Sequence, residues 1–167
     1  MIEILPEDPR RDAADIEALY DRTFGPGHFA KTAERLREGG PSLHDLTRVA
    51  RLNGRLIGVC RLWPLSVGGD AVRAVFFGPL AVDPDHQGEG VGHDIIHHCI
   101  AAAIAAGWPA GIIIGARGYF EGLGFSTKHA DRLRFPGPQD VRRVMTIPLA
   151  DPDVTLGGQV RADKTDH

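Results

Sequence analysis

Three alternating glycines stand where a strand gives way to a helix, and this junction limits the folds open to the chain. The run Asp83–Ile96 reads DPDHQGEGVGHDII, with Gly88, Gly90 and Gly92 at every second position. An apolar strand-like segment precedes it, and small and apolar residues in a helical pattern follow it as far as Ala106. Because glycine costs a helix about 1 kcal/mol against alanine, something other than helix stability requires these residues here.

A junction of this kind predicts an anion site, and phosphate is the usual occupant. The first backbone N–H groups of a helix have no partner inside it, and the helix dipole adds positive potential there. Glycine has no Cβ, so a phosphate can approach the backbone closely. We therefore predict that Gln87–Gly92, the glycine turn, holds a pyrophosphate. The alternative is a glycine-rich loop that simply turns the chain.

Three phosphate-binding patterns fit this run to different degrees. A P-loop requires Gly-Lys-Ser/Thr, whereas His93 and Asp94 follow Gly92, so a P-loop is excluded. The Rossmann fingerprint G-x-G-x-x-G fails because His93 stands at its last position. The pattern Gln/Arg-x-x-Gly-x-Gly/Ala is filled completely by the glycine turn.

The rest of the chain predicts a mixed α/β domain in the order β-α-α-β-β-β-α-β-α-β. A length of 167 residues and a hydrophobic content of 43% suit one such domain. We expect residues 1–150 to form it, followed by a polar, frayed tail over 151–167. The expected strands are 1–5, both sides of an Asn53-Gly54 turn within 46–67, 71–82, 110–116 and 141–150, and the expected helices are 12–24, 31–40, 90–106 and 118–125.

The composition limits the binding partners and the cellular compartment that suit this chain. A net charge of −3 argues against nucleic acid or an anionic membrane as the main partner. No apolar run approaches the length of a membrane span, and no signal peptide is visible. Cys60 and Cys99 are too few for a disulfide framework or a zinc site, so we expect reduced thiols in a cytoplasmic protein without a metal. His93 and His97 have a zinc-binding spacing, but a partly exposed helix face is the simpler interpretation.

The glycine turn and its surroundings resemble the GNAT superfamily of acyl-CoA-dependent N-acyltransferases, in particular its YhbS-like bacterial branch. The resemblance rests on GPLAVDPDHQGEGVG, on GW followed by an apolar strand, on YFEGLGF and on a closing VMTIPLA, in this order. It covers about Arg48 to Leu149. It implies a mixed, mostly antiparallel sheet with splayed central strands and helices on both faces.

The same resemblance implies acetyl-CoA as cosubstrate, a primary amine as acceptor and N-acetyl transfer as the reaction. The pyrophosphate would lie on the glycine turn, and the pantetheine arm would pair with the end of the preceding strand, where a backbone N–H would polarise the thioester carbonyl. The implied cofactor-binding residues are Leu80, Ala81, Val82, Gln87, Gly88, Glu89, Gly90, Val91, Gly92, Tyr119 and Phe120. The alternative function is an acyl-CoA-binding sensor or interaction domain with little or no catalysis.

The chain departs from the family pattern at the proton donor. The family often has a tyrosine five residues before the phenylalanine of its GF pair, and Phe120 stands there. Tyr119 is the only phenol in this segment, so we predict it as the acid that protonates the leaving thiolate. The general base stays open between Asp45, Asp83, Glu121 and a water. The acceptor, a small molecule or a peptide, also stays open, as does a homodimer through the last strands or the tail.

Overall fold

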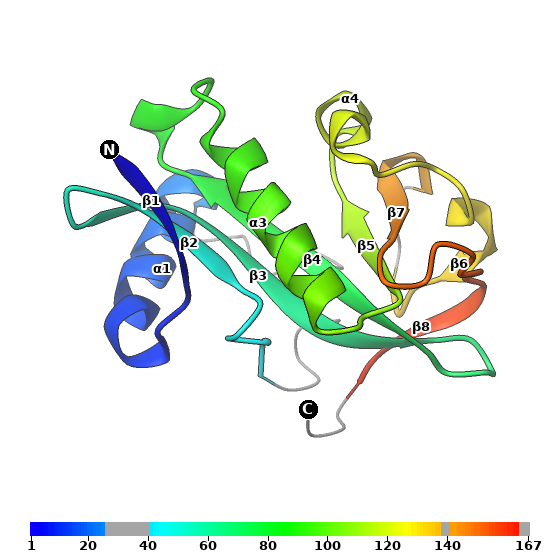
Figure 1. The fold of residues 1–167 in the computed structure, drawn as a ribbon. Coiled ribbons are helices and arrows are strands. Elements are labelled where there is room, and N and C mark those ends of the chain that lie inside the picture. The colour runs from blue at the N-terminus through cyan, green and yellow to red at the C-terminus, as the bar shows by residue number, and fades with distance from the viewer. Residues whose placement is uncertain (26–40, 138–140, 164–167) are drawn as a thin grey trace.

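The computed structural model describes residues 1–25, 41–137 and 141–163, so the helix expected at 31–40 lies outside the described residues. Eight strands form a sheet with the main order β1-β2-β3-β4-β5-β7. Figure 1 shows them with their helices. The strands are β1 (Ile2–Pro6), β2 (Arg48–Leu52), β3 (Arg55–Val67), β4 (Val72–Val82), β5 (Ala110–Ile114), β6 (Leu133–Arg134), β7 (Val144–Pro148) and β8 (Gly158–Ala162). The helices are α1 (Pro9–Phe24), α3 (Val91–Ala105) and α4 (Arg117–Phe120), with 3₁₀ turns η2 (Pro84–His86), η3 (Glu121–Leu123), η4 (Ala130–Arg132) and η5 (Val141–Arg143).

Most neighbouring strands run antiparallel, as predicted. The exceptions are the pairs β4–β5 and β6–β8, which are parallel. The hairpin between β2 and β3 turns at Asn53 and Gly54, whose φ angles are 52° and 83°. Both residues tolerate a positive φ. The antiparallel pairing of β2 with β3 on the two sides of this turn confirms the hairpin expected from the Asn-Gly pair.

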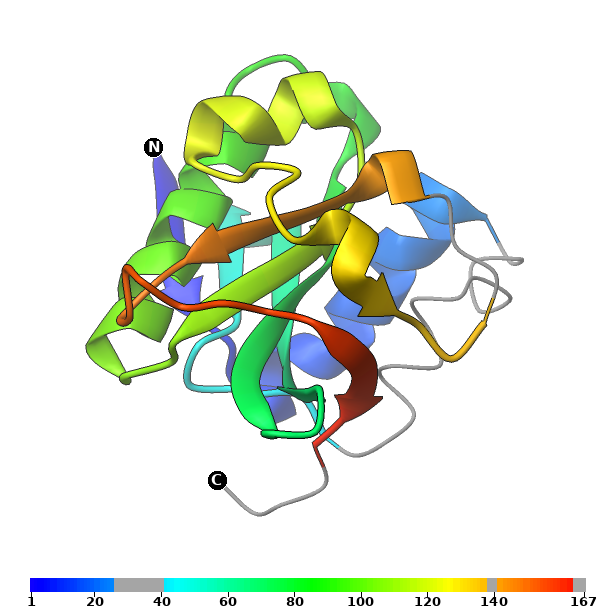
Figure 2. The same ribbon diagram turned by 90° about the vertical axis from the view of Figure 1, so that its right-hand side faces the viewer.

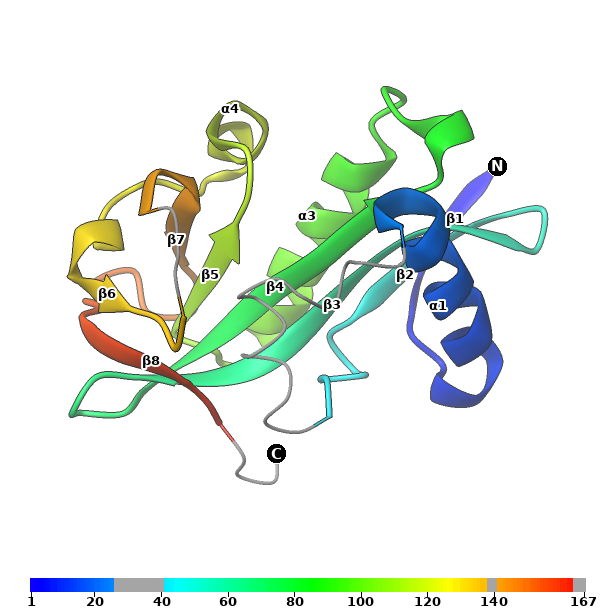
Figure 3. The same cartoon turned by 180° about the vertical axis from the view of Figure 1, so that it is seen from behind.

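Helices α1 and α3 cover opposite faces of the sheet (Figures 1 and 3). Side chains alternate along a strand, so Cys60 and Leu62 of β3 pack with α3, and Val59 packs with α1. Trp63 and Leu65 continue the Val59 row and belong to a third cluster, around β6 and β8. We call the two sides the α3 face and the α1 face. The third cluster therefore lies on the α1 face.

The expectation of a frayed tail after Asp151 is wrong as far as Ala162. Strand β8 pairs with the end of β3 and with β6, and Figure 2 shows it in red beside the β3–β4 hairpin. Leu156 and Val160 are buried against the α1 face. This segment is mostly polar, but its two buried apolar side chains and its backbone pairing hold it in place. Two apolar residues are too few to give a periodic hydrophobic pattern in so short a stretch of sequence. The last predicted strand is also shorter, because Val141–Arg143 forms η5.

Helix α1 begins three residues earlier than predicted because Asp8 caps it. The Asp8 carboxylate accepts hydrogen bonds from the backbone N–H groups of Arg10 and Arg11, at 3.0 and 3.3 Å. Pro9 occupies the first turn, where its missing N–H costs nothing. The helix ends at Phe24, as the sequence predicts, and Gly25 is its C-cap.

Asp12 of α1 is fully buried and forms an ion pair with Arg51 of β2. Burial opposes its ionisation, but hydrogen bonds from Arg11, Arg51 and the Asp8 backbone outweigh burial and lower the pKa of Asp12 to about 2. A carboxyl whose pKa is lowered by folding stabilises the protein above its unfolded pKa of about 4, and this contribution is lost as the pH falls toward 2.

We expect Asp12→Asn to lower the free energy of unfolding by about 3 kcal/mol at neutral pH, because Arg51 loses its buried charge partner and keeps only the half-exposed Asp15. The matched control is Asp15→Asn, since Asp15 also bonds Arg51 but is half-exposed, and it should cost about 1 kcal/mol or less. Urea unfolding at several pH values measures both. If the cost of Asp12→Asn is as large near pH 2 as at neutral pH, the ion pair is not its cause.

Candidate functional site

Strands β4 and β5 separate halfway along β4. Their parallel ladder ends at the pair Phe77–Ile113, and on the other side the register with β3 shifts at Gly78 and Pro79. Proline cannot donate to a ladder and glycine weakens one. In the part of the chain that the structure describes, Leu80–Val82 therefore has no strand on its β5 side, which confirms the splay. Figure 1 shows β4 leading on to α3, and β5 to α4, on the two sides of this opening.

The bulge at Gly78 and Pro79 is held by two side chains of the α1 face. The indole Nε1 of Trp63 donates to the Gly78 carbonyl at 2.7 Å. The hydroxyl of Tyr20 donates to the Pro79 carbonyl at 3.3 Å. Side chains therefore satisfy backbone groups that a regular ladder would pair, and the bulge is a fixed feature of the site.

The three glycines of the turn are present for two different structural reasons. Gly88 and Gly90 have φ angles of +84° and +85°, which other residues rarely adopt. A Cβ at either position would meet nothing within 4 Å, so the backbone there is open. Gly92 lies inside α3, and a Cβ there would overlap the hydroxyl of Tyr119. The positive φ angles of the turn favour glycine at the first two positions, and the close approach of the tyrosine requires it at the third.

The start of α3 offers backbone donors. Gly90 is its N-cap and has no side chain to cap the helix, so the N–H groups of the first turn have no acceptor within it. The nearby carboxylate of Glu89 is half-exposed and bonds His86 Nδ1 at 3.0 Å. Gln87 folds back, and its Nε2 donates to the Val82 carbonyl at 3.1 Å. The glycine turn and the end of β4 are thus linked directly.

Tyr119 and Phe120 point in different directions. Phe120 is only 7% exposed, and its ring packs against Gly115 and Phe125 in the core. Tyr119 is 39% exposed, with its ring centroid 4.3 Å from that of His93. Consecutive residues on a helix point about 100° apart, so only one of the two rings can face the opening. That ring belongs to Tyr119.

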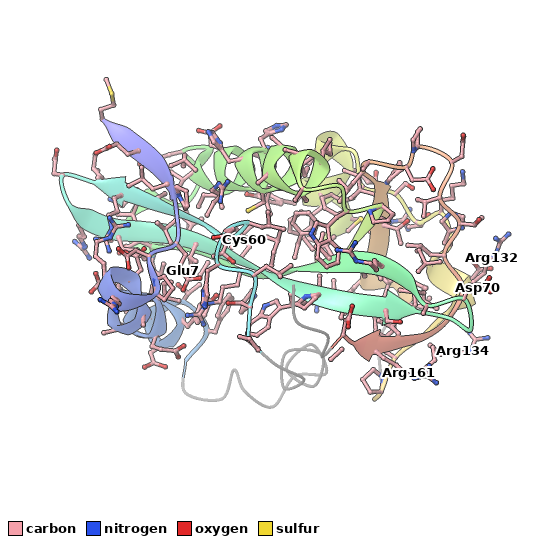
Figure 4. The ribbon with its side chains drawn as sticks, turned by 60° about the horizontal axis from the view of Figure 1, so that its bottom comes forward. Glu7, Cys60, Asp70, Arg132, Arg134 and Arg161 are labelled. Carbon is pink, nitrogen blue, oxygen red and sulfur yellow. The ribbon has the colours of Figure 1, made fainter. Side chains whose placement is uncertain are left out.

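Burial keeps the groups around the opening protonated. It raises the pKa of Tyr119, and negative charge on Cys60 would raise it further. Burial also raises the pKa of Cys60, followed by the effect of neighbouring Cys99. Both cysteines are free and buried, and Figure 4 shows Cys60 on β3. Tyr119 therefore carries its proton at neutral pH.

Asp83, at the end of β4, is a poor proton acceptor. Its Oδ1 accepts from the Asp85 backbone at 3.0 Å, and its Oδ2 bonds Arg22 and Arg55 at 3.2 and 3.1 Å. The Asp85 hydrogen bond, and then the charges of Arg55 and Arg22, lower the pKa of Asp83. This carboxylate stays ionised and fixes the entry to the glycine turn.

Within residues 1–25, 41–137 and 141–163, no group of three or more His, Cys, Asp or Glu side chains could hold a metal ion. No helix in these ranges has the length and apolar character needed to cross a membrane. His93 packs on Tyr119, and His97 is exposed on the same helix.

Residues 44–127 match the sequence profile of the Acetyltransferase (GNAT) domain. The matched span is just over half of the chain and holds the bulge, the glycine turn and Tyr119. The chain belongs to this family. The resemblance inferred from the motifs is thereby confirmed.

Relatives within the family agree with this assignment. YhbS of Escherichia coli (strain K12), named as an uncharacterized N-acetyltransferase, is 29% identical over 135 residues, which are 80% of each chain. YjhQ of the same strain, named likewise, is 27% identical over 164 residues, 95% of this chain and 91% of the relative. The crystal structure of E. coli YhbS in complex with CoA has a TM-score of 0.80 at 27% identity and covers 98% of this chain and 89% of that one.

A Brucella melitensis GNAT acetyltransferase in complex with acetyl-CoA has a TM-score of 0.73 at 24% identity, over 98% of this chain and 96% of that one. At this identity the likeness shows the fold alone. Together with YhbS it confirms the predicted fold class, a mixed, mostly antiparallel GNAT sheet with helices.

Proposed function

We propose that this GNAT family member transfers the acetyl group of acetyl-CoA to a primary amine. The observation that carries the proposal is the opening between β4 and β5, which leads from the bulge along Leu80–Val82 to the glycine turn. Among residues 1–25, 41–137 and 141–163, no strand pairs with the β5 side of this edge, and the helix that follows begins without a side-chain cap. The YhbS structure, described in complex with CoA, supports this assignment.

We assign the cofactor-binding roles along this path. The N–H groups of Gln87, Gly88, Glu89, Gly90, Val91 and Gly92 would hold the pyrophosphate. The backbone of Leu80, Ala81 and Val82 would pair with the pantetheine arm as an added strand. Ala81 offers only its backbone, because its side chain is buried on the α1 face. Phe120 supports the site from the core, and Tyr119 borders the arm.

The chemistry needs a neutral amine, a polarised carbonyl and a proton for the leaving sulfur. A backbone N–H of Leu80–Val82 would stabilise the negative charge that develops on the thioester oxygen. Tyr119 keeps its proton at neutral pH and would donate it to the CoA thiolate. The amine would approach from the α1 face of the bulge, where Trp63 and Tyr20 hold the carbonyl groups in place.

Release of free CoA in the presence of amines tests this function. The panel contains a polyamine, an amino acid, an aminoglycoside and a peptide with a free N-terminus. We expect at least one to give amine-dependent release of CoA and an acetylated product in the mass spectrum. Tight binding of acetyl-CoA without release for any amine would contradict the enzyme and favour the alternative, an acyl-CoA sensor.

Ligands should also stabilise the protein selectively. Acetyl-CoA or CoA at one hundred times its dissociation constant should add about 2.7 kcal/mol to the free energy of unfolding. For a domain of this size that raises the melting temperature by roughly 5 to 11 °C. NADH and ATP at equal concentration should leave it unchanged, which differential scanning fluorimetry measures. A shift with NADH alone would revive the Rossmann interpretation.

The compartment and the oligomeric state belong to the same proposal. We place the protein in the cytoplasm, because two free, buried thiols suit a reducing environment. The homodimer stays a prediction that light scattering tests.

A further inference from the structure

A small pocket beside β7 has no part in the function proposed so far. It has a volume of about 230 Å³, and its walls include five apolar residues and one arginine, which are Ala130, Leu133, Phe135, Val141, Val144 and Arg134. Sites that hold a whole small molecule usually measure about 300–1,000 Å³. This pocket, which we call the β7 pocket, is smaller and therefore fits one group of a ligand.

The β7 pocket lies next to the point where β4 and β5 separate. Val144, in its wall, pairs with Ile114 of β5. The residue before Ile114 is Ile113, the last of β5 that pairs with β4, and its partner Phe77 is followed by the bulge. Figure 3 shows β7, β5 and β4 in this order. Neighbouring strands lie about 4.8 Å apart, so Val144 is roughly 10 Å from Gly78.

Apolar side chains join the β7 pocket to the bulge along the α1 face. Val144, Ile114 and Trp63 all belong to the third cluster, which lies on that face. The ring of Trp63 packs there, and its Nε1 donates to the Gly78 carbonyl at 2.7 Å. Ile114 and Trp63 are only partly buried, so they leave apolar surface that a bound molecule can cover. An amine that approaches the bulge from this face would therefore bring the rest of its molecule to the β7 pocket.

The rim of the β7 pocket combines apolar surface with a positive charge. Val141 is 49% exposed, and Phe135 is partly buried. Arg134 is exposed, and its Nη1 donates to the carbonyl groups of Asp131 and Leu133 at 3.0 and 3.2 Å. Within the described part of the chain, no carboxylate pairs with this guanidinium. The two carbonyl groups hold it in place, and an anionic group of a ligand can bind its other nitrogens.

A second guanidinium stands on the same side of β6 and β8. Arg134 pairs with Gln159 of β8, and Arg161 follows two residues later. Residues two apart on a strand point to the same face, and both arginines are exposed. Figure 4 shows them at one end of the molecule, with Arg132 and Asp70. The combined potential of the arginines favours an anion over a cation there.

We propose that the β7 pocket binds the apolar group of the acceptor amine and that Arg134 binds an anionic group beside it. This assignment rests on the proposed function. Arg134 repels a protonated amine, so the amine end points away from it, toward the bulge. An extended peptide spans at most about 3.3–3.6 Å per residue, so roughly 10 Å corresponds to three residues. The acceptor that fits is a short peptide with a free N-terminus, an apolar third residue and a carboxylate next to it.

The tripeptide Gly-Gly-Phe is the probe, with Gly-Gly-Phe amide, Gly-Gly-Gly and spermidine for comparison. At saturating acetyl-CoA, kcat/KM should be at least about ten-fold higher for Gly-Gly-Phe than for the others, because only this molecule both fills the pocket and pairs with Arg134. Arg134→Gln should lower the kcat/KM of Gly-Gly-Phe about ten-fold, through KM, and bring it close to that of the amide. Arg132→Gln is the matched control, since Arg132 is exposed and lies outside the pocket, and it should change the preference for the acid little.

Two further variants test the pocket itself. Ala130→Leu extends into it and should raise KM for Gly-Gly-Phe about ten-fold, and less for Gly-Gly-Gly, which has no side chain to place there. Val141→Asp puts a negative charge on the exposed rim and should also raise KM for Gly-Gly-Phe. It changes no core residue, so it decides the test if the melting temperature shows that Ala130→Leu does not fold.

Several results would overturn this assignment. They are equal kcat/KM for Gly-Gly-Phe and its amide, an Arg132→Gln variant that loses as much as Arg134→Gln, and an unchanged KM for Gly-Gly-Phe in Val141→Asp. Wild-type turnover with spermidine but not with Gly-Gly-Phe would overturn this assignment alone. If wild type acetylates no amine, the proposed function fails and the acceptor assignment falls with it.

Discussion

The variant Gly90→Asp should lose CoA binding and keep its fold. A Cβ at Gly90 meets nothing within 4 Å, and aspartate tolerates the left-handed backbone found there better than most residues. The new carboxylate would stand at the start of α3, where we propose that the pyrophosphate binds. Two negative charges about 4 Å apart repel by roughly 4 kcal/mol at an effective dielectric constant of about 20, so the affinity should fall roughly a hundred-fold or more.

Gly90→Asn is the matched control for this variant. Asparagine has the same shape and tolerates the same backbone but carries no charge, so it should weaken CoA binding far less than aspartate. Calorimetric titration of both variants with CoA gives the comparison. Equal losses of CoA affinity in the two variants would show that the size of the new side chain, rather than its charge, weakens binding. A folded Gly90→Asp protein that binds CoA like wild type would show that no phosphate lies at Gly90.

Tyr119→Phe should lower turnover ten-fold or more and change CoA affinity little. Loss of a general acid typically costs about 10²- to 10⁴-fold, and a thiolate is a tolerable leaving group, so the lower end applies. The phenylalanine keeps the ring contacts with His93 and Phe120, so the fold should not change. Phe120→Tyr should not raise turnover, because its ring packs in the core against Gly115 and Phe125.

Gly92→Ala gives a second test of the same tyrosine. Its methyl group would overlap the Tyr119 hydroxyl and displace it, so turnover should fall as in Tyr119→Phe. Without the hydroxyl the clash is relieved, so the double variant Gly92→Ala/Tyr119→Phe should be no slower than Tyr119→Phe alone. Steady-state kinetics at saturating amine measures the cycle. A silent Tyr119→Phe together with a faster Phe120→Tyr would instead place the lost acid at Phe120.

Local signals explain what the sequence predicts well here. The Asn53-Gly54 hairpin, helix α3 and the buried strand β5 each follow from residues close together in the chain. The glycine turn can be predicted for the same reason. Its spacing alone does not show that its glycines are present for two different structural reasons. Gly88 and Gly90 allow the positive φ angles of the turn, whereas Gly92 leaves room for a side chain from α4.

Contacts between distant residues explain what the sequence does not reveal. Glu7 meets His44 and Arg61 across 37 and 54 positions, and Tyr20 meets Pro79 across 59. No periodic pattern records such pairs. Tyr20 fits an ordinary helix packing stripe, and its hydroxyl on the bulge appears only once β4 is irregular. Helical geometry sets Tyr119 and Phe120 about 100° apart, but the packing of Phe120 against Gly115 and Phe125 decides which of them faces the opening.

A crystal structure of the protein with bound CoA tests the central claim most directly. We predict phosphate oxygens within hydrogen-bonding distance of the N–H groups of Gln87–Gly92 and the pantetheine arm between β4 and β5, beside Leu80–Val82. The sulfur should lie near the bulge at Gly78 and Pro79, with the Tyr119 hydroxyl on the same side of the sheet as α3. CoA bound away from the glycine turn, or with its arm outside the opening, would contradict the account.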